Sequence, residues 1–257
     1  MNISDLTGEE IKRSLSESAK RHPSAGETIR ILFAPTRIDR YNLDEAGALY
    51  SQLCPDDYET VVIVESSPSE QKKKLPMPSH KQFKTSLGAV PVDDKLRNDL
   101  CDEDDDFYID DQAYHDSMSL YDQLILLQSQ LEEFKVVSIQ ITDEHPDIIR
   151  ELAHALEEVL GPRPALTIFC CNLDESHRNE FDILSDYIET DDLSGLMNHL
   201  NSGESYINGK SSFLAGTLLA GLWGLEIKFA GASDSDFPAG SNLLSGYAEK
   251  TPHQIFG

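Results

Sequence analysis

Short runs of consecutive apolar residues recur along the chain, and between them apolar residues return every three or four positions. The runs are rich in β-branched residues, which is typical of strands covered on both faces. They predict strands at residues 28–34, 60–66, 135–141, 165–171 and 225–231. The periodic stretches predict helices at residues 5–20, 44–53, 93–100, 117–131, 146–160, 176–201 (in one or two pieces) and 211–223. Strands that alternate with helices predict an α/β fold, a single domain over residues 1–257 with a mainly parallel central sheet flanked by helices.

Two segments interrupt this pattern and are predicted as loop excursions from the sheet. Residues 68–92 are rich in proline and lysine, with a short strand expected at 88–92. Residues 101–113 include seven carboxylates in the ten positions from Asp102 to Asp111. They lack the ligand spacing and the central glycine of a calcium-binding loop, so we expect a solvated acidic loop rather than a metal site. Residues 1–27 are expected to form an N-terminal helix outside the alternation.

The charge balance narrows the classes of partner. The chain has 21 basic and 46 acidic residues, a formal net charge of −25. This charge repels phosphates, so nucleic acids and anionic membranes are not expected partners. It would keep the protein soluble or adapt it to a salty cytoplasm. Because the sequence has neither an apolar run of about 18 residues nor the apolar core of a signal peptide, we expect a cytoplasmic protein.

The common catalytic and phosphate-binding motifs are absent from the sequence. There is no serine-hydrolase elbow, no phosphate-binding glycine loop and no CxxC pair, and the eight histidines do not form HxH or HExxH. Cys170 and Cys171 end a predicted strand, where side chains alternate, so at most one of them faces a cleft. His177 follows Asp174 and Glu175 just beyond that strand. These three residues are the best local approach to a metal triad, although capping of a helix start is the simpler interpretation.

Several short motifs nevertheless occur in a recognisable order. A buried strand ends in Ala-Pro and is followed by a helix with small residues, and a later helix begins after an Asn-Gly-Lys loop. The matching segments are residues 34–39, 65–69, 85–88, 117–124, 170–175, 208–210 and 245–248. In order and spacing they resemble the Memo-like family, also known as AmmeMemoRadiSam system protein B. The resemblance implies a fold similar to that of the class III extradiol dioxygenases and, in the family, a cleft that can hold a redox metal.

The positions at which the family keeps its metal ligands differ in this chain. The family's loop histidines and its cysteine fall on Thr36, Ser69 (or Pro68), Glu175 and Asn208, and its helical Glu-His pair falls on Ser117 and Met118. Hydroxyls, an amide and one carboxylate are poor ligands for iron or copper. We therefore expect no metal and no cofactor, and we interpret the chain as a pseudoenzyme that keeps the family's fold.

A polar cleft remains at the matching positions. Its candidate residues are Thr36, Arg37, Ser66, Ser69, Cys171, Asn172, Asp174, Glu175, His177, Asn208 and Lys210. The leading hypothesis is a non-catalytic binding or partner protein. By the resemblance, its partners are the radical-SAM protein and the AMMECR1-like protein of the same system, or a second copy of the chain.

Two alternatives stay open at the level of the sequence. The first is a metal-independent enzyme that reuses the cleft, with Cys171 as nucleophile and Asp174, Glu175 or His177 as acid or base. The second is a metal-binding oxidoreductase with a rearranged site that includes His177 and His115.

Overall fold

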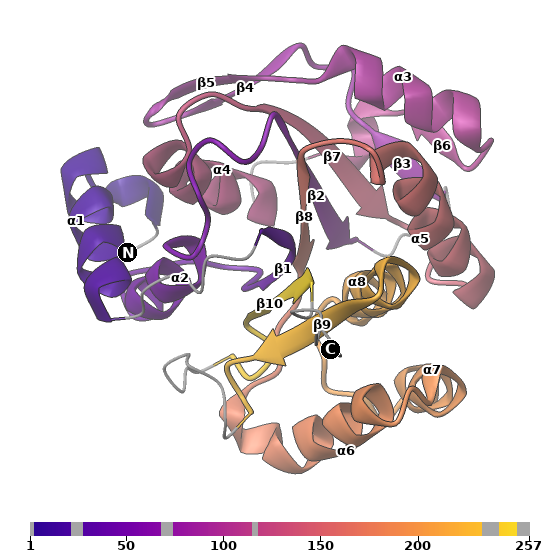
Figure 1. Ribbon diagram of the computed structural model, residues 1–257. Helices are drawn as coiled ribbons and strands as arrows, with labels where there is room; N and C mark the ends of the chain where they lie inside the picture. The colour runs from indigo at the N-terminus through magenta and orange to yellow at the C-terminus, as the bar shows by residue number, and fades with distance from the viewer. Residues whose placement is uncertain (1–2, 22–27, 68–73, 115–117, 233–241, 251–257) are drawn as a thin grey trace, which may run out of the picture.

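A central sheet of six strands organises the protein, in the order β7-β2-β8-β1-β10-β9 (Figure 1). The computed structural model describes residues 3–21, 28–67, 74–114, 118–232 and 242–250. The six strands are β1 (Ile29–Ala34), β2 (Thr60–Ser66), β7 (Lys135–Ile141), β8 (Ala165–Cys170), β9 (Leu225–Phe229) and β10 (Gly246–Lys250). Strands β7, β2, β8 and β1 are parallel neighbours, whereas β10 runs antiparallel to both β1 and β9.

Helices cover both faces of this sheet (Figure 1). One face packs against α1 (Gly8–Arg21), α2 (Leu43–Tyr50) and α4 (Ser119–Gln130). The other packs against α3 (Asp94–Glu103), α5 (Pro146–Leu160), α6 (Arg178–Glu189), α7 (Leu193–Asn201) and α8 (Lys210–Trp223). Three 3-10 helices lie at Ile3–Asp5, Asp111–Ala113 and Glu175–His177. None of the helices within the described ranges is both long and apolar enough to cross a membrane.

The alternation of side chains along β1 explains why its apolar run is continuous. Ile31 and Phe33 point into the core beneath α5 and α8, while Leu32 and Ala34 point into the core beneath α1, α2 and α4. All four side chains are completely buried. A strand sandwiched in this way has no solvent-facing side and needs no polar positions.

The predicted α/β class and the five predicted strands are confirmed, and each predicted helical stretch contains a helix. The two segments expected as loop excursions contain more structure than the sequence indicated. Strand β3 (Leu75–Met77) pairs with β6 (Phe107–Ile109), and β4 (Gln82–Thr85) pairs with β5 (Gly88–Pro91), the short strand expected at 88–92. Strands of three or four residues leave almost no periodic signal, because their stability comes from a partner distant in the chain or from the packing beneath them.

Candidate functional site

A small cavity lies where the parallel strands end. Its volume is about 210 Å³, and it is bordered by the last residues of β2, β7 and β8, by the loop after β1 and by the starts of α4 and α8. The lining residues are Thr36, Arg37, Glu65, Ser66, Ser67, Met118, Ser119, Gln140, Cys170, Asn208 and Gly209. Ligands of open α/β sheets bind at the carboxyl ends of the strands, so this cavity is the candidate site.

Two asparagines hold Thr36 at the edge of the cavity. The side-chain oxygen of Asn172 accepts hydrogen bonds from the backbone N–H of Thr36 at 2.6 Å and from its hydroxyl at 2.7 Å. The side-chain amide of Asn208 donates to the same hydroxyl oxygen at 3.3 Å, and the main chains of the two asparagines pair as an antiparallel bridge. A threonine hydroxyl has one donor and two acceptor sites. The Thr36 hydroxyl therefore keeps one acceptor site for a ligand.

The carboxylate of Glu65 is committed to the start of α4. One of its oxygens accepts from the backbone N–H of Ser119 at 2.7 Å. The other accepts from the backbone N–H of Leu120 at 3.2 Å and from the side-chain amide of Gln140 at 3.3 Å. A carboxylate at a helix N-terminus is stabilised by unpaired N–H groups and by the helix dipole. Glu65 is not among the candidate residues predicted from the sequence, although an acidic residue at the end of an apolar run needs a buried partner and so gives a usable signal.

The start of α8 is pressed closely against the sheet. Gly209 has a left-handed backbone with φ of 79°, and a β-carbon at this position would lie 2.4 Å from the carbonyl oxygen of Cys170. The Ser66 hydroxyl accepts from the backbone N–H of Ser212 at 2.9 Å, and the Ser212 hydroxyl donates to the carbonyl of Val64 at 2.9 Å. Only glycine allows this close approach. The positive end of the α8 dipole is thereby brought to the cavity wall.

Charged groups flank the cavity on its α4 side. Arg37 lines the cavity and is exposed. Asp122 lies beneath the loop that carries Arg37, and its carboxylate accepts from the backbone N–H of Ile38 at 2.9 Å. Burial raises the pKa of Asp122, and this hydrogen bond and the charge of Arg37 oppose the shift only in part. Among the described lining residues, Arg37 is the one with a positively charged side chain that can pair with a ligand.

The two adjacent cysteines face opposite sides of the sheet, as the alternation predicted. Cys170 lines the cavity, whereas Cys171 is fully buried in the core beneath α5 and α8. Burial raises the pKa of both thiols well above the ordinary range, so neither is a thiolate near neutral pH. The candidate residue Cys171 is therefore not at the cavity and is not placed as a nucleophile.

The acidic residues and the histidine that follow β8 build the start of a helix. The Asp174 side chain accepts from the backbone N–H of Ser176 at 2.9 Å and caps the 3-10 turn. Glu175 forms an ion pair with Arg178 at 2.7 Å. The ring of His177 stacks on Tyr206, with 4.1 Å between the ring centroids. Asp174, Glu175 and His177 are absent from the cavity lining, and the simpler interpretation, a capped helix start, describes them well.

The remaining candidates divide between the cavity and its surroundings. Thr36, Arg37, Ser66 and Asn208 are brought together in the lining, and Asn172 supports them from behind. The Lys210 ammonium lies 3.8 Å from the carboxylate of Glu144 and does not line the cavity. Ser69 and His115 lie outside the described residues.

The donor atoms of the lining are mostly neutral. They are hydroxyls, side-chain amides, the thioether of Met118, a protonated thiol and one carboxylate whose two oxygens already accept hydrogen bonds. Within the described ranges, no histidine contributes to the lining. Iron and copper favour imidazole, thiolate and several anionic oxygens together, and this set of donors does not fit them.

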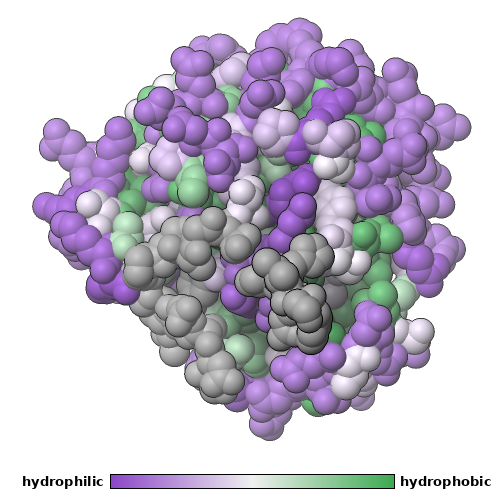
Figure 2. All heavy atoms as spheres, viewed as in Figure 1, coloured by the Kyte–Doolittle hydropathy of each residue, from purple (hydrophilic) through white to green (hydrophobic). Residues whose placement is uncertain are grey.

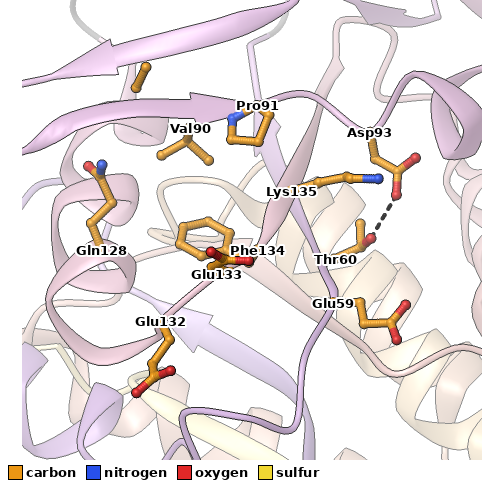
Figure 3. A pocket seen from close by; sticks show the side chains of 11 residues that line it. Glu59, Thr60, Val90, Pro91, Asp93, Gln128, Glu132, Glu133, Phe134 and Lys135 are labelled. Carbon is orange, nitrogen blue, oxygen red and sulfur yellow. Dashed lines mark hydrogen bonds between the residues drawn. The ribbon is translucent and has the colours of Figure 1, made fainter.

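A larger hollow of about 550 Å³ lies at the other end of the sheet, where β2 and β7 begin (Figure 3). Figure 3 shows the side chains of Phe134 and Val90 at its centre and several carboxylates around its rim. The Asp93 carboxylate at this rim is occupied, because it accepts from the Thr60 hydroxyl at 2.8 Å and from the backbone N–H of Leu96 at 3.0 Å. The hollow lacks the converging network seen at the carboxyl ends, so it is not our candidate site.

Comparison with known proteins places the chain in a family. A family model described as Memo-like protein matches residues 6–210. The chain belongs to the Memo-like family. Every residue that lines the cavity of this Memo-like protein lies within the matched range.

A solved structure supports the same fold. The crystal structure of the uncharacterized protein JW3007 from Escherichia coli K12 is similar to this chain, with a TM-score of 0.52 and 12% sequence identity. The match covers 86% of this chain and 98% of that protein. A likeness at this identity shows the fold alone. The search of curated proteins gave no match.

Proposed function

We propose that this Memo-like protein binds a small polar ligand in the cavity and catalyses no metal-dependent reaction there. The observation that carries the proposal is the donor set of the lining, in which hydroxyls and amides stand where the family resemblance implies metal ligands. Among the described residues, neither the thiol nor the carboxylate in the lining is paired with a base that would activate it. A nucleophile beside an oriented base is the usual signature of covalent catalysis. Binding is therefore the role that the side chains support best.

The hydrogen-bonding and charged groups that remain available in the cavity suggest the kind of ligand. The Thr36 hydroxyl keeps one acceptor site, Arg37 supplies a guanidinium, and the start of α8 presents its positive end. A guanidinium pairs best with a carboxylate or a phosphate. The volume of about 210 Å³ is below the roughly 300–1,000 Å³ of pockets for drug-sized ligands. We infer a small organic acid, with its anionic group at Arg37.

The partner role extends this proposal. We propose that the ligand-binding protein works in the cytoplasm with the radical-SAM and AMMECR1-like proteins to which the family name refers, or with a second copy of itself. Co-purification of a tagged chain with these proteins tests the partner role separately from ligand binding.

Titration with a panel of small organic acids tests the proposal directly. We expect saturable binding of at least one acid without turnover, detected by calorimetry and by NMR of the unchanged acid. Arg37→Gln is expected to weaken this binding about tenfold, the loss of roughly one charge-assisted hydrogen bond. Arg40→Gln is the matched control, because Arg40 is exposed, has the same charge and does not line the cavity.

Equal weakening by the two variants would show that the acid binds only through general charge. Conversion of any acid to a product would show that the cavity is an active site. Either result would overturn the proposal.

A further inference from the structure

Three carboxylates that do not line the cavity converge beside α5. Asp104 follows α3, Asp106 precedes β6, and Glu151 projects from α5. One carboxylate oxygen from each residue lies within 4.8 Å of the other two. Figure 1 shows the segments that carry them, with α3, β6 and β3 gathered next to α5. We call these three residues the carboxylate cluster.

Main-chain hydrogen bonds hold the first two members in place. The backbone N–H of Asp106 donates to the side chain of Asp104 at 2.7 Å, and that of Phe107 donates to the carbonyl of Asp104 at 3.2 Å. The backbone N–H of Leu75 donates to the carbonyl of Asp106 at 3.2 Å, which extends the pairing of β3 with β6. The two aspartates are thus positioned by the fold before any ligand arrives.

A buried oxygen in the cluster has no hydrogen-bond partner. Asp106 is 4% exposed, and its buried Oδ2 atom has no hydrogen-bond partner among the residues that the structure describes. Its Oδ1 atom pairs with the ammonium of Lys74, whose side chain is 47% exposed. Buried polar atoms are almost always satisfied, and an orphaned carboxylate oxygen calls for a donor or a cation. The unpartnered oxygen of Asp106 therefore points to a ligand. The acidity of the segment alone would not.

The local charge favours a cation. Lys74 supplies one positive charge against the three carboxylates of the cluster. Glu151 is exposed, and within the described ranges no ion pair neutralises its charge.

We propose that Asp104, Asp106 and Glu151 bind a calcium ion. All donors are hard oxygen atoms, which suit calcium and magnesium rather than copper or zinc. Calcium takes six to eight oxygen ligands in a flexible geometry that accommodates several carboxylates, whereas magnesium keeps most of its water and is usually bound through one or two carboxylates. Three converging carboxylates therefore favour calcium, with water completing its shell. The ion would tie the end of α3 and the start of β6 to α5.

This site could not be predicted from the sequence. The acidic segment lacks the spacing of a calcium-binding loop, and the third ligand, Glu151, comes from a different helix. The expectation of a solvated loop holds for exposed members of the segment such as Asp105, while Asp106 is buried. The inference does not depend on the proposed function of the cavity.

Calorimetric titration of the chelator-treated full chain with calcium chloride tests the site. We expect one saturable calcium site per chain in moderate salt, and a rise in the thermal unfolding temperature on saturation. Glu151→Gln is expected to weaken calcium binding at least tenfold. Glu157→Gln, on the same helix with the same change of charge and outside the cluster, should leave it unchanged.

A third variant tests the competition between Lys74 and the ion for Asp106. Lys74→Gln removes the ammonium that competes for Asp106 and is expected to tighten calcium binding several-fold. Absence of a saturable site, equal weakening by Glu151→Gln and Glu157→Gln, or a preference for magnesium would each overturn the assignment.

Discussion

The cavity at the carboxyl ends of the strands and the carboxylate cluster beside α5 offer opposite kinds of oxygen. The cavity presents hydroxyls and amides that already bond one another, and its carboxylate, Glu65, accepts three N–H bonds. The cluster presents three carboxylates, one of them with a buried oxygen that has no partner among the described residues. Position in the fold indicates where a ligand can bind, and the hydrogen-bonding capacity left on the donor atoms indicates which ligand fits. On this basis we propose an organic ligand for the cavity and a hard cation for the cluster.

Replacing the cavity's carboxylate should have the largest effect on stability. In Glu65→Gln the new amide would direct its N–H groups at N–H donors that the carboxylate now accepts. Leaving buried donors unpaired costs about 1–3 kcal/mol each, and we expect a loss of roughly 3 kcal/mol in the free energy of unfolding. Urea unfolding measures it.

The control is Glu59→Gln, because Glu59 is exposed and directly precedes β2. We expect this variant to change the free energy of unfolding by at most about 0.5 kcal/mol. Equal stability of the two variants would mean that Glu65 is not committed to α4. The contrast between a fully hydrogen-bonded carboxylate in the cavity and a carboxylate with one unpartnered oxygen in the cluster would then fail.

The close approach of α8 to β8 should have the next largest effect. Gly209 and Gly203 both have positive φ, but a β-carbon at Gly209 would meet the Cys170 carbonyl at 2.4 Å, whereas one at Gly203 would meet nothing within 4 Å. Alanine in a left-handed conformation costs about 1–2 kcal/mol. We expect Gly203→Ala to lose about 1 kcal/mol and Gly209→Ala to lose about 1 kcal/mol more, together with its affinity for the cavity's ligand.

Denaturant unfolding of both variants gives the difference directly. If Gly209→Ala were no less stable than Gly203→Ala, the start of α8 would not be packed as tightly as the cavity requires.

The α/β fold was predictable because its signals are local. Strands buried on both faces leave continuous apolar runs, and helices leave a period of three to four residues. Thr36 and Arg37 were found because they lie just beyond a strand, whereas Asn208 was found through the resemblance to the Memo-like family. The alternation of Cys170 and Cys171 predicted that they face opposite sides, but only the packing of the helices shows which side holds the cavity.

The features that could not be predicted from the sequence depend on contacts between residues that lie far apart in the chain. Strands β3 and β6 pair across a helix, with Leu75 opposite Phe107. Glu65 is a site residue only because α4 begins beside it, and Asp106 meets Glu151 only in the fold. Glu65 leaves a local signal, because it is an acidic residue at the end of an apolar run, but no local pattern identifies its partner or the partner of Asp106.

Elemental analysis tests the central claim most directly. The full chain would be incubated under reducing conditions with iron, copper, zinc and calcium, freed of loosely bound ions by desalting, and analysed beside Glu151→Gln. We predict no stoichiometric iron, copper or zinc in either protein, and calcium in the wild-type chain alone. One tightly held iron or copper ion per chain, retained in Glu151→Gln, would contradict the account, because the cavity's donors would then form a redox metal site after all.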